Sequence, residues 1–183
     1  MRTVYLDNNA TTAVAPEVFE AMRPFYTEHF GNPSSGHHLG DRPASAVRDA
    51  RAKVAAFLGC SDADVIFTSC GTESDNLALR GIARAARGPR RGIVYAAIEH
   101  HAVMNSARAL AEEGLPVAAV RARPDGQLDL DELASKLDDR TLVVAVMLAN
   151  NETGVIQPLA EVVRLARACG AFVHCDAVQA AGK

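Results

Sequence analysis

Apolar and polar positions follow one another along this chain in two recurring patterns. Short runs of β-branched and other apolar residues predict strands, whereas apolar residues three and four positions apart predict helices. Because strands alternate with helices from residue 65 onward, we expect an α/β fold, a three-layer αβα arrangement around a mainly parallel sheet. The predicted strands are residues 3–6, 65–67, 93–98, 117–120, 142–148 and 171–173, and the predicted helices are residues 16–26, 43–58, 72–85, 102–111, 130–137 and 159–166.

The composition narrows the class of protein. The chain has 183 residues, of which 49% are hydrophobic, and this is enough to bury a core. A net charge of −3 gives no reason to expect nucleic acid or a membrane surface as the main partner, and no apolar run is long enough to cross a bilayer. The first residues lack the apolar stretch of a signal peptide, and the four cysteines show no CxxC spacing. We therefore expect a cytoplasmic protein with free thiols.

The stretch from Val65 to Asn76 has the chemistry of an anion-binding turn. A predicted strand is followed by small residues that include Gly71, and then by a helix that begins near Thr72. Backbone N–H groups at such a helix start point the same way, at the positive end of the helix dipole, which suits a phosphate. The alternative is an ordinary strand-to-helix turn in which Thr72 caps the helix.

Polar side chains also follow three later strands of the predicted sheet. The carboxyl ends of parallel strands lie along one edge of an open sheet, and ligands bind there. We therefore expect these side chains to share a crevice with the anion-binding turn. Taken singly, a histidine at a strand end is more often a hydrogen-bonded structural residue, and an aspartate is often a helix cap. The residues are His100 after strand 93–98, Asn151 after strand 142–148, and Asp176 and Gln179 after strand 171–173.

A phosphate-binding turn, an imidazole and a carboxylate at one sheet edge together favour pyridoxal phosphate as the ligand. Its phosphate suits the turn at Gly71 and Thr72, and its flat ring suits the imidazole of His100. Its pyridine nitrogen needs an acidic partner such as Asp176 to stay protonated and act as an electron sink.

Other groups have plainer interpretations. Five arginines near the end of the predicted helix 72–85 favour a solvated helix face with cations at its C-terminal end, although they could contact an anion. The cysteines favour small buried side chains. A metal site is a further alternative, but its spacing matches no standard zinc pattern. The arginines are Arg80, Arg84, Arg87, Arg90 and Arg91, the cysteines are Cys60, Cys70, Cys169 and Cys175, and the metal alternative uses Glu99, His100, His101, His174 and Asp176.

These motifs resemble the cysteine desulfurases, which are fold-type I pyridoxal-phosphate enzymes of the class V aminotransferase family. The resemblance runs along the whole chain, and the cysteine before Gly71 and the pair His174-Cys175 are closest to the nitrogen-fixation (NifS-like) type. The segments that carry it are residues 5–12 (YLDNNATT), 31–35 (GNPSS), 68–76 (TSCGTESDN), 99–103 (EHHAV), 151–154 (NETG) and 174–179 (HCDAVQ).

The resemblance implies a role for each matching residue. Gly71 and Thr72 would bind the phosphate of the cofactor, and Asp176 would pair with the pyridinium nitrogen. The resemblance makes His100 the catalytic residue, which stacks on the ring and assists proton transfer. The remaining assignments are Asn151 and Gln179 for the phenolic oxygen side of the ring, and residues 7–12 and Asn32 for the approach to the site.

The resemblance also implies an activity and an architecture. The enzyme would convert L-cysteine to alanine and leave a protein persulfide, which an iron–sulfur scaffold or another sulfur-acceptor protein would take up for iron–sulfur cluster assembly. It would act as a homodimer. Residues 1–15 would form an N-terminal arm, and residues 16–183 would form the N-terminal portion of the large domain that binds pyridoxal phosphate. The alternatives are another class V lyase or transaminase, and a truncated, non-catalytic partner subunit.

The resemblance places two catalytic groups beyond Lys183, namely the lysine that carries the cofactor and the cysteine that accepts sulfur. The 183-residue chain alone is therefore expected to form no alanine when it is incubated with pyridoxal phosphate and L-cysteine. It is also expected to be less stable or to associate, because strand edges and apolar surface are left uncovered. Alanine production at an enzyme's rate, followed by amino-acid analysis, would contradict the first expectation.

Overall fold

The structure is a computed structural model that describes residues 3–183. The chain forms two compact units, with the boundary between Phe67 and Thr68. The predicted division into an arm of residues 1–15 and a main part of residues 16–183 stays a prediction, and its first two residues lie outside the described part. Among the described residues, no helix is long and apolar enough to cross a membrane.

The first unit is helical. Residues 3–7 form no strand, contrary to the prediction for residues 3–6, and a turn follows in which the Asp7 carbonyl accepts from the N–H groups of Ala10 (3.2 Å) and Thr11 (3.3 Å). The predicted helix 16–26 is broken into two at Pro24, because proline has no N–H for the helical ladder. The elements are α1 (Pro16–Met22), α2 (Pro24–Thr27), α3 (His38–Leu58) and the short 3₁₀ helix η1 (Asp62–Asp64).

Helix α3 begins five residues before the predicted start, so that Pro43 lies inside the helix and is buried. Pro43 cannot donate to the carbonyl of Leu39 four residues earlier. The loop of residues 31–36 packs against this first turn through two glycines. A Cβ on Gly31 would overlap the Leu39 carbonyl oxygen, and one on Gly40 would lie 2.5 Å from the Ser35 carbonyl oxygen. Glycine is therefore required at both positions.

The predicted strand 65–67 is wrong. Val65 is buried, but Ile66 and Phe67 are 70% and 48% exposed, and within the described residues this segment pairs with no strand. Arg51 of α3 holds it instead, because its guanidinium donates to the Val65 carbonyl and lies 4.9 Å from the centre of the Phe67 ring. An apolar run predicts a strand only where a neighbouring strand supplies the hydrogen bonds.

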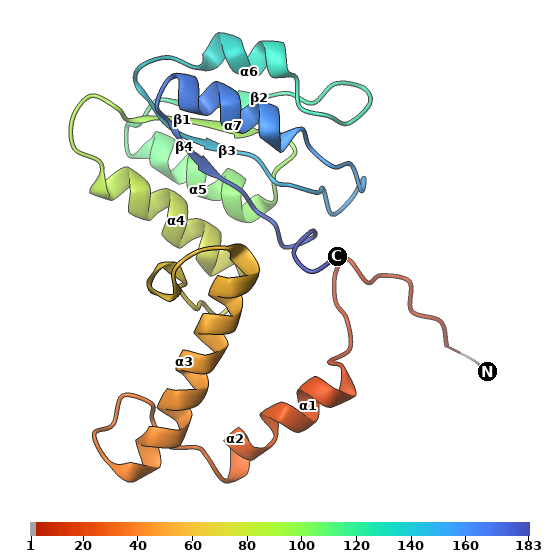
Figure 1. Ribbon diagram of the computed structural model, residues 1–183. Coiled ribbons are helices and arrows are strands. Elements are labelled where there is room, and N and C mark those ends of the chain that lie inside the picture. Colours follow the sequence, from red (N-terminus) through yellow and green to blue (C-terminus); the bar gives the residue numbers. More distant parts are fainter. Residues whose placement is uncertain (1–2) are drawn as a thin grey trace. The chain divides into compact units, whose positions relative to one another are not determined.

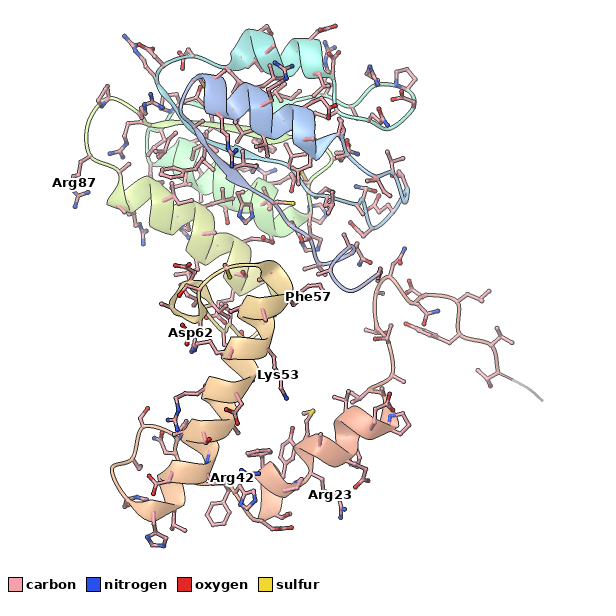
Figure 2. All side chains as sticks on the ribbon, in the orientation of Figure 1. Arg23, Arg42, Lys53, Phe57, Asp62 and Arg87 are labelled. Carbon is pink, nitrogen blue, oxygen red and sulfur yellow. The ribbon has the colours of Figure 1, made fainter. Side chains whose placement is uncertain are left out.

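The predicted apolar face of α3 is also largely exposed. Phe57 is 64% exposed and Leu58 is 60% exposed, and Figure 2 shows Phe57 projecting from the last turns of the helix. Helical periodicity therefore identified the helix but not a buried face.

The second unit confirms the predicted three-layer α/β fold (Figure 1). Its four strands are all parallel and lie in the order β2-β1-β3-β4. Each of the three connections between successive strands contains a helix, as parallel pairing requires. The strands are β1 (Gly92–Ala96), β2 (Val117–Val120), β3 (Thr141–Ala145) and β4 (Phe172–His174), and the helices are α4 (Gly71–Ala85), α5 (His101–Glu112), α6 (Leu130–Lys136) and α7 (Leu159–Ala168).

Alternate residues of the central strands pack on opposite faces of the sheet. Ile93 of β1 and Val143 of β3 pack with α4 and α5 residues such as Leu79. The next residue of each of these strands packs on the other face with α6 and α7 residues such as Val162. Because both faces are covered, β3 is buried along its whole length, which explains its uninterrupted apolar sequence.

The basic cluster behaves as a solvated helix face only in part, because Arg90 lies beyond α4, is half-buried and donates to the carbonyl of Cys169 (2.6 Å). Arg80 and Arg84 of α4 pair with Glu113 at 3.0 and 3.8 Å. Arg87 donates to the carbonyl oxygens of Arg84, Ala85 and Ala86, which end the helix, and Figure 2 shows it at the surface. Arg87 therefore satisfies the negative end of the helix, whereas Arg80 and Arg84 pair with an acidic side chain.

We predict that Gly31→Ala loosens the first turn of α3, because the added methyl group meets backbone atoms that cannot turn away. The expected cost is about 1–3 kcal/mol. Hydrogen exchange should show faster exchange at the amides of Ser35 and Gly40, which donate to Asn32 (3.0 Å) and His37 (2.8 Å). Gly36→Ala is the matched control, because nothing lies within 4 Å of its added Cβ. Equal exchange in the two variants would contradict the packing argument.

Candidate functional site

The segments that follow β1, β3 and β4 lie along one edge of the sheet, because all three strands are parallel. Hydrogen bonds join these segments beyond the ends of the strands. The N–H of Leu148 donates to the carbonyl of Asp176 (2.9 Å), and the N–H of Met147 donates to the carboxylate of Glu99 (2.5 Å). The side chain of Asn150 donates to the carbonyl of Ile98 (2.9 Å). The structure therefore brings together the segments that carry His100, Asn151 and Asp176.

The N-terminus of α4 lies beside the segment that follows β4. A Cβ added to Gly71 would be 3.2 Å from a methyl group of Val178. The first helical hydrogen bond is donated by Ser74 to Cys70 (3.1 Å), so the N–H groups of Gly71, Thr72 and Glu73 precede it. Cys70 is the residue before the helix and Thr72 lies inside it, so the alternative in which Thr72 caps the helix is wrong.

This helix N-terminus stabilises negative charge. The N–H of Glu73, the hydroxyl of Ser69 and the N–H of Thr72 lower the pKa of the Cys70 thiol. The Glu73 carboxylate accepts from the hydroxyl (2.5 Å) and the N–H (2.7 Å) of Ser69, which lowers its pKa. An anion near these donors is favoured by the same N–H groups and by the helix dipole.

Cysteine burial differs from the prediction. Cys60 and Cys70 are exposed, so the interpretation of all four cysteines as small buried side chains is wrong for these two, while Cys169 and Cys175 are half-buried. Both exposed cysteines lie at the end of a helix or just before one, where the chain turns at the surface.

His100 is the N-cap residue of α5 and its side chain is exposed. Its Nδ1 accepts a hydrogen bond from the N–H of Ala102 (3.1 Å). The neutral ring therefore carries its proton on Nε2. The backbone of the helix thus fixes both the orientation of the imidazole and its tautomer, which leaves Nε2 as the proton-carrying atom.

Asp176, Gln179 and Asn151 are all half-buried. The carboxylate of Asp176 accepts from the N–H of Val178 (2.9 Å), and the Gln179 side chain accepts from the Lys183 ammonium group (2.9 Å). Asn151 opens a turn that the neighbouring Asn150 side chain holds together.

The roles predicted for all six site residues, His100, Gly71, Thr72, Asn151, Asp176 and Gln179, stay predictions. So does the role of residues 7–12 and Asn32, which belong to the first unit.

The structure adds a buried polar cluster that the sequence analysis did not assign to the site. Asp75 of α4 is 5% exposed, and its carboxylate lies 3.0 Å from Nε2 of His174 on β4. Glu99 is 4% exposed. The sequence held two signals for this cluster: the metal alternative grouped Glu99 with His174, and Asp75 lies four residues before Leu79 and so falls on the buried stripe of α4.

Burial dominates the protonation of this cluster. It raises the pKa of Glu99 to about 8, against a hydrogen bond from Met147, and the charges of Asp176 and Asp75 add to the effect. It also raises the pKa of the Cys175 thiol to about 11, with Glu99 and Asp176 contributing. Both groups are therefore neutral near pH 7. Among residues 3–183, no group of three or more histidine, cysteine or acidic side chains is placed to hold a metal ion.

Comparison with known proteins gives a consistent picture. Residues 4–183 match the aminotransferase class-V family. The cysteine desulfurase of Trichormus azollae is 48% identical over 183 residues, which are 100% of this chain and 46% of that protein. The cysteine desulfurase NifS of Azotobacter vinelandii is 47% identical over 184 residues, again 100% of this chain and 46% of that protein. The solved structure of a NifS-like protein is 42% identical with a TM-score of 0.94, covering 98% of this chain and 50% of that one. The chain spans about half the length of the curated relatives it matches.

We predict that His174→Ala destabilises the second unit, because the buried Asp75 carboxylate loses its partner. The expected loss in the free energy of unfolding is about 1–3 kcal/mol, the usual cost of an unsatisfied buried polar group. Urea denaturation measures it. His101→Ala is the control, because His101 is exposed, and it should change stability by less than about 0.5 kcal/mol. If the two variants unfold alike, the pair does not hold α4 against β4.

Proposed function

The chain belongs to the aminotransferase class-V family, and on this basis we propose that it is part of a cysteine desulfurase that uses pyridoxal 5′-phosphate. The curated relatives named above carry the name cysteine desulfurase. One observation supports the proposal most strongly: hydrogen bonds join three strand-end segments next to the N-terminus of α4. These segments and this helix end carry the residues proposed to contact the phosphate, the ring and the pyridine nitrogen.

The residues at this edge fit the cofactor. Its phosphate matches the N-terminus of α4, where N–H groups precede the first helical bond and lower the pKa of the Cys70 thiol. A Cβ added to Gly71 would lie 3.2 Å from a side-chain methyl group of Val178, so a larger residue would crowd this cradle unless Val178 shifts. The pyridine nitrogen matches the carboxylate of Asp176, which is half-buried and held by a backbone N–H.

In the proposed mechanism each side chain has one task. Gly71 and Thr72 bind the phosphate through their N–H groups, and Asp176 keeps a proton on the pyridine nitrogen. The bound cofactor supplies an electron sink that weakens bonds at the amino carbon of the substrate. His100 covers the ring and holds a proton at Nε2, where the hydrogen bond from Ala102 directs it. Asn151 and Gln179 orient the phenolic oxygen.

Sulfur transfer from L-cysteine is the proposed reaction. A thiolate of the enzyme attacks the sulfur of L-cysteine, a sulfur–sulfur bond forms, and the carbon–sulfur bond of the substrate breaks. The substrate carbon that has lost its sulfur takes up a proton, so that alanine is released. The enzyme keeps the sulfur as a persulfide. None of the four cysteines of this chain is proposed as that thiolate, and burial keeps Cys175 in its neutral form. We further propose that a homodimer passes the sulfur to an acceptor protein for iron–sulfur cluster assembly.

We predict that the protein expressed from its complete gene releases alanine from L-cysteine in the presence of pyridoxal phosphate. Asp176→Asn should lower the rate of alanine formation by about 100-fold or more, because the ring nitrogen loses its acidic partner. The control is Asp139→Asn, which changes an exposed aspartate outside the site.

Two results would redirect the proposal. A keto acid or another product in place of alanine would indicate a different class V lyase or transaminase. No product at all, together with tight association with a second, active subunit, would indicate a non-catalytic partner.

A further inference from the structure

Glu99 is a buried acid that the proposed mechanism does not use. It lies between the end of β1 and the start of α5, next to His100, and is 4% exposed. One carboxyl oxygen accepts from the N–H of Met147 (2.5 Å). The other is buried and has no hydrogen-bond partner in the part of the chain that the structure describes.

The position of Glu99 follows from the way the sheet ends. Strand β1 ends at Ala96. The chain after β3 keeps forming sheet-like hydrogen bonds through Met147 to Leu148, where β1 no longer lies beside it. Consecutive N–H groups of an extended chain point to opposite sides, so Leu148 bonds toward β4 and Met147 toward β1. Glu99 supplies on the β1 side the acceptor that the strand no longer provides. Its side chain thereby ties the turn that ends in His100 to β3.

Negative charge surrounds Glu99. From the segment after β4 comes Asp176, and from α4 comes Asp75, which His174 partners, whereas the nearby Cys175 thiol is neutral near pH 7. The packed segment after β3 contributes only the Met147 N–H. Two neighbouring carboxylates resist ionising together, and the more buried one keeps the proton. Glu99 is 4% exposed, whereas Asp176 is half-buried and accepts a backbone hydrogen bond. The proton therefore belongs on Glu99.

We propose that Glu99 is a positioning residue of the cofactor site: through its bond to Met147 it fixes the turn that carries His100, and in its neutral form it adds no second negative charge beside Asp176, the proposed partner of the pyridine nitrogen. The inference rests on the proposed function for the identity of the cofactor. A second negative charge at Glu99 would be repelled by the carboxylates of Asp176 and Asp75, and this repulsion would displace the turn that carries His100 and the Asp176 side chain from their places at the site. Cofactor binding should therefore weaken as the pH rises through about 8, where Glu99 loses its proton.

The first test needs no cofactor. Infrared difference spectra of the protein from the complete gene, between about pH 7 and about pH 9, should show loss of the carbonyl band of a protonated carboxylic acid. Glu99→Gln should lack this change. The matched control, Glu112→Gln on the exposed side of α5, should keep it. A band that persists in Glu99→Gln, or is absent in the unaltered protein, overturns the inference.

The second test uses pyridoxal phosphate, with binding followed by its absorbance at each pH. The unaltered protein should lose about tenfold or more in affinity relative to Glu99→Gln as the pH rises through about 8, because the amide cannot ionise. The comparison at equal pH removes the titration of the cofactor itself. Glu99→Ala, which cannot bond Met147, should bind weakly at every pH, and Glu99→Gln should restore binding.

The outcomes separate the two proposals. If the unaltered protein binds the cofactor and forms alanine, but Glu99→Gln shows the same pH dependence, the inference fails and the proposed function stands. If neither protein binds pyridoxal phosphate, the proposed function fails, and the positioning role for the cofactor fails with it.

Discussion

The pairing of β3 with strands on both sides is the interaction on which the rest of the second unit depends. β3 is bonded to β1 and to β4 in parallel, and it is buried along its whole length. Past its end the same alternation continues, since Met147 bonds toward the β1 side and Leu148 toward the β4 side. The two flanking segments are therefore held at a fixed spacing from one central chain, without needing to contact each other directly.

This arrangement explains why polar residues gather at one edge. The two faces of the sheet are filled by apolar contacts with α4 and α5 on one side and α6 and α7 on the other. The loops at the strand ends can hold polar side chains without loss of core packing. The N-terminus of α4 adds N–H groups that precede the first helical bond, beside Val178, so the same edge carries both acidic groups and backbone donors.

The second unit buries two acidic side chains, Asp75 and Glu99, in one cluster. Asp75 and Glu99 are both nearly inaccessible to solvent, which is costly for charged groups unless they are paired or neutral. Asp75 is paired with His174, whereas Glu99 is protonated near neutral pH. A protein retains such a cluster where it is useful, and a cationic ring nitrogen beside Asp176 would be one use for it.

The sequence by itself determined the fold class, the parallel sheet and the motifs that identify the family. The strand within residues 142–148 could be predicted because burial on both faces leaves an apolar run. Residues 65–67 were wrongly predicted to form a strand for the same reason, because they are apolar. Only the tertiary structure shows whether a neighbouring strand exists to pair with them. The set of strand-end residues was likewise readable, since parallel strands end at one edge. The pairing of Asp75 with His174, 99 residues apart, and the burial that protonates Glu99 were decided only by the tertiary structure, because desolvation and distance depend on which elements pack together and are not encoded in local sequence.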